Sequence, residues 1–504
     1  MLKHSRIILL LLSIYLFSYT LLRAISLGLT YDESFTFLNY VKAPLINSFI
    51  YFNPNNHFLN TLLIKLSTTF LGNSELAIRL PNLLGYLLFL IFSYLFLKKN
   101  FNKILIVPFF IIINFNPYLI EFFGLGRGYG LSMSMIMVSL YYLSLSFEPN
   151  QISSQIKVNI IFLSSFFGML SVLANLTSLN FYIALIIVIF IINFFKVFIL
   201  QKNKLNFRNI FDFLINKWSS YIYLTLIILV VLLSIPVTLM KLNNQLYFGG
   251  NKGFWLDTVF SLVRDSLYNN FNFFIFNIIL FFVLITFISS IIFFFYFTYK
   301  NHYKPKTLFP YSILFIFILS ILSSIAQNIL LKTNYLIDRT ALFFLFLFLL
   351  NLTLLLNSLY LESKNKVKKF VFILICFLAI IFTLNLFNNF NMTGTLEWHY
   401  DQNTNKAFQD SEEYIIKSQI SKTSPVNLCT TNLYSTTLKY YLYKTNLTVN
   451  TNLNIFQLNK ASPNNLCTLY YTEESDLKDF NISKLSFIKS YPETKTNLFK
   501  LNLN

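Results

Sequence analysis

Two adjacent carboxylates, Asp32 and Glu33, lie shortly after the first apolar run of the chain. A carboxylate beside a membrane-borne substrate can take a proton from an acceptor hydroxyl, which is the work of a general base. Its neighbour can hold a divalent cation or position the first carboxylate. The alternative is a solvated acidic pair that ends a helix. The segment indicates a proton-transfer site at Asp32, with the preceding Tyr31 as a candidate substrate contact.

A histidine follows in the same loop, at His57 in the stretch from Asn53 to Asn60. A lone histidine is usually a hydrogen-bonded structural residue, but it can also transfer a proton or bind a ligand. We treat His57 as a candidate for substrate contact and, together with Glu33, for binding a metal ion.

Glu75 and Arg79 are one helical turn apart at the start of the second long apolar run. Arginine suits a bidentate grip on a phosphate in a site of low dielectric constant. Alternatively, Arg79 extends to the membrane interface and pairs with Glu75. Arg79 is therefore a candidate phosphate ligand, and Glu75 is a candidate for the same site.

Further cations occur in loops where the predicted topology needs none. Arg127 lies among the glycines of residues 124–130, beside Tyr129, and the glycines can bring backbone N–H groups close to a ligand. Lys332 and Arg339 flank Asp338, which can instead simply neutralise Arg339. Carboxylates combined with cations beside a membrane are what a lipid phosphate donor and a hydroxyl acceptor require.

The composition places these residues in a membrane protein. The chain has 504 residues, of which 56% are hydrophobic and only 12% are charged, whereas a soluble domain is about a quarter charged. The net charge of +19 would suggest nucleic acid in a soluble protein. Here the bases cluster between apolar runs, so they indicate topology and we expect no nucleic-acid partner.

Hydropathy predicts an all-α polytopic protein with about eleven transmembrane helices. The first run, which starts at the N-terminus and ends near Ser26, lacks a cleavage site and predicts an uncleaved span. The other predicted spans are residues 79–97, 104–120, 128–147, 158–174, 178–199, 220–240, 272–298, 309–331, 338–358 and 369–388.

The alternate loops are rich in lysine and arginine, as the positive-inside rule requires of cytoplasmic loops. The pattern predicts a multi-pass protein of the inner (plasma) membrane, with a cytoplasmic N-terminus and an extracytoplasmic C-terminus. We expect a membrane domain over residues 1–388 and an outer domain over residues 389–504. The long outer loop at 29–76 is predicted to contain interfacial helices at Ala43–Tyr51 and Phe58–Leu71.

The C-terminal segment alternates strand-like and helical patterns and predicts a small α/β domain. The expected strands are Val426–Thr430, Leu447–Val449, Leu466–Tyr471 and Leu485–Tyr491. The expected helices are Asp410–Ile420 and Leu433–Tyr443. Cys429 and Cys467 fall in two of these strands, where they can form a disulfide or pack as two thiols. Cys376 falls within a span and is expected to pack there.

The acidic pair, the histidine stretch and the run from Glu75 to Gly85 occur in an order that resembles the bacterial branch of the protein mannosyltransferase and aminoarabinose transferase superfamily. The likeness covers about the first 85 residues. It implies a GT-C fold glycosyltransferase of the glycosyltransferase 39 type. This sequence departs from the family pattern at His57, which is followed by Phe58 and Leu59 in place of two prolines.

The resemblance implies a polyprenyl-phosphate-linked sugar as donor, used at the outer leaflet and transferred with inversion to an envelope acceptor: a protein, lipid A or another glycan. By carry-over, Asp32 is the general base and Glu33 its partner. Arg79, Arg127 and Arg339 correspond to contacts of the donor phosphate. Metal use differs among such enzymes, so a divalent metal ion is left open and no cofactor is assigned.

Two other classes of function fit parts of the pattern. A transporter or flippase of lipid-linked sugars would also need spans and basic residues, but such proteins tend to show internal repeats, and we find none here. A glycan polymerase or ligase of another fold would also use outer arginines. Such an enzyme would keep its activity when Asp32 and Glu33 are both neutralised.

Overall fold

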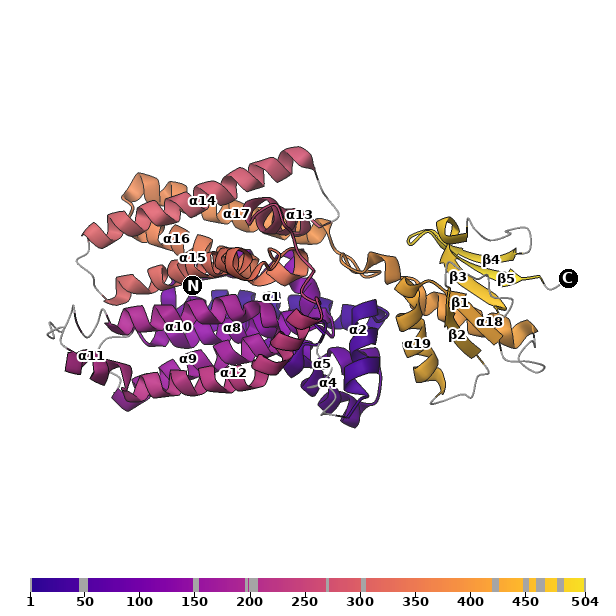
Figure 1. Ribbon diagram of the computed structural model, residues 1–504. Helices are drawn as coiled ribbons and strands as arrows, with labels where there is room; N and C mark the ends of the chain where they lie inside the picture. The colour runs from indigo at the N-terminus through magenta and orange to yellow at the C-terminus, as the bar shows by residue number, and fades with distance from the viewer. Residues whose placement is uncertain are drawn as a thin grey trace. The chain divides into compact units, whose positions relative to one another are not determined.

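The computed structural model describes residues 2–44, 53–147, 154–194, 198, 207–268, 272–300, 305–418, 426–446, 453–458, 467–477 and 485–502 (Figure 1). Clustering of the chain gives two compact units. The first, here called the helical unit, comprises Met1–Leu21, Phe49–Leu63 and Leu80–Phe390. The second, here called the sheet unit, comprises Leu22–Ser48, Ile64–Arg79 and Asn391–Asn504. The domain boundaries drawn from the sequence stay predictions.

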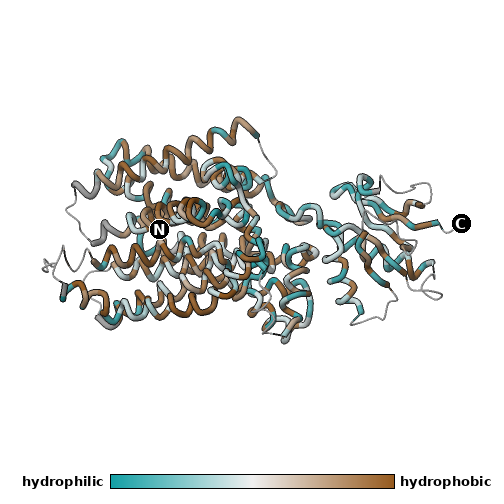
Figure 2. The backbone as a smooth tube through the Cα atoms, viewed as in Figure 1, coloured by the Kyte–Doolittle hydropathy of each residue, from teal (hydrophilic) through white to brown (hydrophobic). Residues whose placement is uncertain are grey.

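The protein is a multi-pass membrane protein. Its described residues contain ten helices long and apolar enough to cross a membrane, or eleven if one bent pair counts as a single span, in agreement with the predicted number. Figure 2 shows apolar residues along these helices. They are α1 (Leu2–Ser26), α5 (Glu75–Asn100), the bent pair α6 (Ile106–Asn114) and α7 (Pro117–Glu121), α8 (Gly128–Leu145), α9 (Ser154–Ala174), α10 (Leu179–Phe194), α12 (Lys217–Leu242), α14 (Phe273–Lys300), α15 (Pro305–Leu331), α16 (Leu342–Glu362) and α17 (Asn365–Asn388).

The predicted span over residues 104–120 is bent by 67°. Pro117 has no backbone N–H and therefore favours the first turn of a new helix. Asn116 caps that helix by accepting a hydrogen bond from the backbone N–H of Leu119 (3.0 Å). The second helix continues into a 3-10 turn, η2 (Phe122–Gly124). The bend carries the chain toward Arg127, which directly precedes α8.

Small hydroxyl side chains join the packed helices of the helical unit. α8 packs against α9, and α10 packs against α15. The Ser139 hydroxyl of α8 donates to the Ser164 carbonyl of α9 (2.7 Å), and the Ser132 and Ser178 hydroxyls are 2.7 Å apart. Such contacts let helix backbones approach closely where lipid provides no hydrophobic drive between them.

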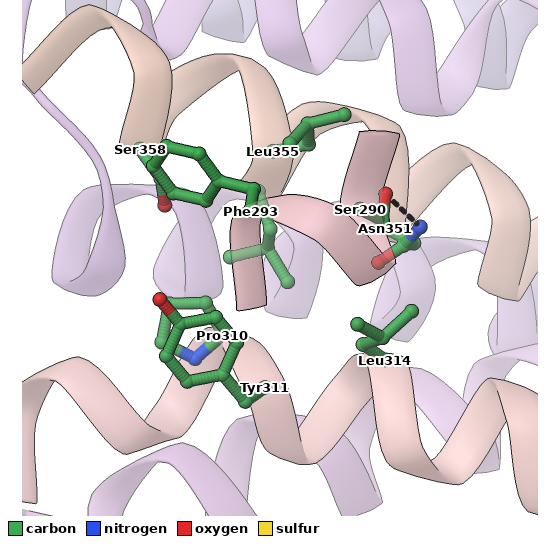
Figure 3. Close-up of a pocket in the computed structure, with 9 residues that line it drawn as sticks. Ser290, Phe293, Pro310, Tyr311, Leu314, Asn351, Leu355 and Ser358 are labelled. Carbon is green, nitrogen blue, oxygen red and sulfur yellow. Dashed lines mark hydrogen bonds between the residues drawn. The ribbon is translucent and has the colours of Figure 1, made fainter. Parts of the chain in front are cut away.

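A small cavity of about 20 Å³ lies among α14, α15 and α16 (Figure 3). The Asn351 amide donates to the Ser290 hydroxyl on its wall (2.9 Å). This volume suits about one water molecule and is far too small for a sugar or a lipid phosphate. The shorter elements of the helical unit are η3 (Leu176–Ser178), α11 (Phe207–Leu214), η5 (Trp255–Val259), α13 (Phe260–Ser266) and η6 (Asp338–Ala341).

The sheet unit confirms the predicted α/β character of the C-terminal segment. The five strands among its described residues form a mixed sheet in the order β2-β1-β3-β5-β4, in which β1 is parallel to both neighbours and β5 is antiparallel to β3 and β4. The elements are η7 (His399–Asp401), α18 (Thr404–Ser418), β1 (Val426–Thr430), α19 (Asn432–Asn446), β2 (Leu453–Gln457), β3 (Leu469–Glu473), η9 (Glu474–Leu477), β4 (Leu485–Tyr491) and β5 (Thr496–Leu501). Cys429 and Cys467 form a disulfide.

Two predicted elements fall on residues that the structure does not describe. The strand at Leu447–Val449 lies outside the described residues, and so does the helix at Ala43–Tyr51 from residue 45 onward. The other predicted interfacial helix is present as α4 (Phe58–Leu71). The first loop also forms α2 (Tyr31–Thr36) and a π-helical turn, η1 (Phe37–Val41), which the sequence analysis did not predict.

Candidate functional site

The acidic segment begins α2 with a reciprocal pair of capping bonds. The Glu33 N–H donates to the Thr30 hydroxyl (3.3 Å), and the Thr30 N–H donates to the Glu33 carboxylate (2.9 Å). This capping box satisfies two backbone donors at the start of the helix. Glu33 is fully buried, whereas Asp32 is half-buried. The two neighbouring carboxylates therefore have different environments, and Asp32 is the one that solvent or a substrate can reach.

Arg79 binds the buried carboxylate in the sheet unit. Its Nε and Nη2 donate to the two oxygens of Glu33, each at 2.8 Å, and both side chains are fully buried. Its remaining N–H groups donate to three backbone carbonyls: Ala24 (3.2 Å), Leu27 (2.7 Å) and Gly28 (2.7 Å).

A guanidinium has five N–H donors, and this structure uses all five of them within the protein. Arg79 thus ties the end of α1 to the start of α2. A phosphate could bind it only by displacing a carbonyl or Glu33. The predicted contact between Arg79 and the donor phosphate stays a prediction, and the observed contacts are structural.

Glu75 does not pair with Arg79, although the two are one turn apart. Instead, Lys444 of α19 donates to both oxygens of Glu75, at 2.8 and 2.7 Å. Helical spacing alone suggested the local pair. Each residue finds its partner in a segment distant in the sequence.

The second group of predicted site residues belongs to the helical unit and centres on His57. The imidazole is 4% exposed, its ring lies 4.8 Å from that of Tyr129, and its Nδ1 lies 3.2 Å from the Ala174 carbonyl. Because a carbonyl only accepts, Nδ1 carries the proton and Nε2 is left as an acceptor. Nε2 is buried and has no hydrogen-bond partner among the described residues.

Burial and the charges of Arg127 and Arg339 lower the pKa of His57 well below its usual value, against a smaller opposing effect of the Ala174 carbonyl. The imidazole is therefore neutral near pH 7. Arg127 donates to the backbone and side-chain oxygens of Asn55. The structure thus brings two arginines around a buried, neutral histidine.

Gly128 makes this packing possible. A Cβ atom at this position would lie 1.9 Å from the Ala174 carbonyl oxygen and 2.8 Å from the Cβ of His57. Any larger residue would push these groups apart. The glycine run was expected to let the backbone approach a ligand. At Gly128 it instead lets the backbone pack closely against Ala174 and His57.

Asp338 pairs with Arg264 (2.7 Å), and Arg264 also pairs with Asp265 (2.8 Å). The expected local pair of Asp338 with Arg339 stays a prediction. The Arg339 guanidinium lies 4.8 Å from the ring centroid of Phe248, over its face, a favourable cation–π arrangement. Lys332 is exposed and has a φ of 57°.

Glu121 is a buried acid that the sequence analysis did not single out. Glu121, at the end of α7, is 3% exposed and accepts a hydrogen bond from the Tyr268 hydroxyl. An acid inside an apolar span is rare and commonly functional. That signal was present in the sequence, because Glu121 follows directly on the predicted third span.

Glu33, one of the two residues proposed to bind a metal, does not fit that role in this structure. Both oxygens of Glu33 are bound by Arg79, and a guanidinium competes directly with a cation for them. The described part of the chain contains no cluster of three or more His, Cys, Asp or Glu side chains arranged to hold a metal ion. No step of the proposed chemistry is therefore routed through a metal.

Among solved structures, the chain is similar to ArnT from Cupriavidus metallidurans bound to undecaprenyl phosphate, with a TM-score of 0.53 and 9% identity over 99% of this chain and 98% of that one. The chain has a GT-C fold. The apo state of the same ArnT gives a TM-score of 0.52 at 8% identity, covering 99% of this chain and 98% of that one.

Another GT-C structure, the apo oligosaccharyltransferase of Archaeoglobus fulgidus, matches with a TM-score of 0.46 and 12% identity over 85% of this chain and 63% of that one. No protein-family model and no curated protein matches the sequence.

Proposed function

We propose that the protein is an integral-membrane glycosyltransferase that transfers a sugar from a polyprenyl-phosphate donor to an envelope acceptor on the outer face of the plasma membrane. The acceptor class comprises proteins, lipid A and other envelope glycans. The observation that carries the proposal is the full-length fold shared with ArnT, whose structure holds undecaprenyl phosphate. The basic alternate loops support a cytoplasmic N-terminus and an extracytoplasmic C-terminus.

In the proposed reaction, the Asp32 carboxylate takes the proton of an acceptor hydroxyl. The acceptor oxygen attacks the anomeric carbon as the bond from that carbon to the phosphate oxygen breaks, which inverts the configuration. The polyprenyl phosphate leaves with the bonding electron pair. Arg127 and Arg339 stabilise the charge that develops on the phosphate. Glu33 holds Arg79 and thereby fixes the segment that carries Asp32.

The test is sugar transfer by detergent-purified protein, supplied with a panel of polyprenyl-phosphate sugars and envelope acceptors and measured by mass spectrometry. Asp32→Asn removes the base and is expected to lower transfer about 100-fold or more, the usual contribution of general-base catalysis. The matched control is Asp212→Asn in α11, because that aspartate is exposed and lies in a predicted cytoplasmic loop. It should retain wild-type transfer.

Donor consumption by wild type but not by the Asp32 variant would support the proposal and name the donor. Full activity after Asp32 and Glu33 are both neutralised would favour a polymerase or ligase. Movement of an unchanged lipid-linked sugar across sealed vesicles, without transfer, would favour a flippase.

A further inference from the structure

A short segment of the helical unit, residues 332–337, leads from the end of α15 to η6, whose second residue is Arg339. Apart from a β-bridge at Tyr335, this segment has no regular secondary structure. Backbone polar groups outside helices and strands need partners elsewhere in the protein. Several of these partners come from the connection between α12 and α14, here called the α12–α14 loop (residues 243–268).

The α12–α14 loop pairs with the first part of this segment. The Gly250 and Tyr335 backbones exchange two hydrogen bonds in an antiparallel bridge (2.9 and 2.8 Å), and the Asn334 amide donates to the Tyr247 carbonyl (2.7 Å). Gly249 has a φ of 142°, and a Cβ atom there would lie 2.5 Å from the Tyr335 carbonyl oxygen. Position 249 therefore needs glycine for both its conformation and its space.

The same loop also holds Asp338, the residue before Arg339. The Asp338 N–H donates to the Ser261 hydroxyl (3.0 Å), and Arg264 binds the Asp338 carboxylate (2.7 Å). Asp338 has a φ of 50°, in the left-handed region that few residues other than glycine adopt. These two bonds from α13 hold the backbone in that conformation where it enters Arg339.

Arg339 itself contacts the loop through Phe248, the residue before Gly249. Its guanidinium lies 4.8 Å from the ring centroid of Phe248. A ring against one face of a guanidinium restrains the plane in which its N–H groups lie, and a guanidinium binds a phosphate through pairs of N–H groups in that plane. Because Phe248 is uncharged, this contact orients the cation without neutralising it.

We propose that Phe248 is a positioning residue for Arg339, and that the α12–α14 loop sets the direction from which Arg339 binds the phosphate of the polyprenyl donor. The proposal rests on the proposed function for its ligand. Its structural part, the coupling of the loop to Arg339 through Phe248, can be measured without a ligand.

Two substitutions at Phe248 separate the effect of the ring from that of its bulk. Phe248→Leu keeps an apolar side chain but removes the aromatic face, whereas Phe248→Tyr keeps the ring. The matched control is Phe254→Leu. Phe254 belongs to the same loop, and its ring contacts that of Phe344, with the centroids 5.1 Å apart.

Donor affinity is measured by titrating the detergent-purified full chain with a fluorescent polyprenyl phosphate. Phe248→Leu is expected to bind about threefold to tenfold more weakly, which is the range of a cation–π contact. Phe248→Tyr and Phe254→Leu should bind like wild type. In an Arg339→Met background, Phe248→Leu should weaken binding no further, because a residue that acts through Arg339 has no effect once Arg339 is gone.

A pair of glycine variants tests the backbone of the loop. Gly249→Ala strains the backbone and places a Cβ atom against the Tyr335 carbonyl, so it displaces the loop from the segment before Arg339. Gly253→Ala is the matched control, because Gly253 has a φ of 131° but a Cβ there would meet no described atom within 4 Å. Gly249→Ala should weaken donor binding at least as much as Phe248→Leu, and Gly253→Ala should bind like wild type.

Additive effects of Phe248→Leu and Arg339→Met on donor affinity, or an equal loss in Phe254→Leu, would overturn the proposal. If Phe248→Leu does not fold, the glycine pair decides, and equal binding by its two members would overturn the proposal.

The same double-mutant cycle on the thermal unfolding temperature needs no ligand. We expect the effects of Phe248→Leu and Arg339→Met to be non-additive there too, because each substitution removes the same contact. If wild type binds no polyprenyl phosphate while the unfolding temperatures show this coupling, the proposed function fails and the contact between the loop and Arg339 stands.

Discussion

The arginines of the two units differ in what surrounds them. In the sheet unit, Arg79 donates all five of its N–H groups to Glu33 and to three carbonyls. In the helical unit, Arg127 donates to the neutral Asn55, and Arg339 lies over an aromatic ring. The charges of both arginines act on His57, whose Nε2 has no hydrogen-bond partner among the described residues.

This difference separates an arginine that builds a site from arginines suited to bind a ligand. A buried cation that is fully satisfied by the protein has little to gain from a phosphate. Two cations gathered around a neutral histidine make a positive region that favours an anion. We therefore expect Arg79 to act in stability, and we expect Arg127 and Arg339 to act in donor binding. Variants of each arginine can test these expectations.

The largest expected effect is that of Arg79→Met. It leaves the Glu33 carboxylate buried without its cation, which costs about 3–5 kcal/mol when one partner of a buried ion pair is removed. We expect loss of most folded protein, measured by size-exclusion profile and thermal unfolding in detergent. The matched control, Arg208→Met, removes an exposed arginine and should unfold at the wild-type temperature.

Adding Glu33→Gln to Arg79→Met should recover only part of the loss, because three carbonyls still lack their donor. An Arg79→Met protein that is stable but has lost donor binding would contradict the comparison and would restore Arg79 as a phosphate ligand.

The next effect concerns activity more than stability. Arg127→Met removes two hydrogen bonds of a buried side chain to Asn55, so we expect it to unfold below the wild-type temperature but above Arg79→Met. It should bind the polyprenyl-phosphate donor at least about tenfold more weakly, because it loses a charge-assisted contact to phosphate. Arg127→Lys should retain part of the affinity, since lysine keeps the charge but not the bidentate geometry. Donor affinity is measured by titration with a fluorescent polyprenyl phosphate. Wild-type affinity in Arg127→Met would remove the basis for assigning this arginine to the donor.

The sequence predicted the membrane helices well because each span is long and apolar, a signal that needs no knowledge of packing. It also drew attention to Asp32, Glu33 and Arg79. The sequence did not predict which of them pair, because Arg79 and Glu33 are 46 residues apart and short-range helical spacing favoured Glu75 as the partner of Arg79. The partner of Glu75 is 369 residues away in the sequence, and local sequence patterns cannot predict such a contact.

Other differences did leave local signals. The bend in the third span is encoded by Asn116 and Pro117, a capping residue followed by proline at the first helical position. Glu121 was visible as an acid beside an apolar run. Asp401, by contrast, lies in an ordinary polar stretch, and only the tertiary structure shows that its carboxylate is buried and accepts hydrogen bonds from the Thr404 and Thr437 hydroxyls.

The smallest expected effects are changes of the free energy of unfolding with pH. These changes have opposite signs in the two units. Burial, with the charges of Arg127 and Arg339, lowers the pKa of His57, so the unfolded helical unit binds the proton more readily. Its contribution to stability is present above about pH 6.5, the unfolded value, and is lost as the pH falls below it. Burial, aided by the charge of Glu33, raises the pKa of Asp401 to about 8. Its contribution is full below the unfolded value near 4 and is lost as the pH rises toward 8.

The chain has three tryptophans, which makes the two slopes separable. Trp398 is buried in the sheet unit, close before Asp401 in the sequence, so its fluorescence in a Trp218→Phe, Trp255→Phe background follows that unit. Trp218 and Trp255 follow the helical unit in Trp398→Phe.

The free energy of unfolding of each unit changes by at most about 1.4 kcal/mol per pH unit for one proton. His57→Asn should flatten the acid-side slope of the helical unit alone, and Asp401→Asn the slope of the sheet unit alone. If one substitution flattened both slopes, the two titrations would not be independent properties of the two units.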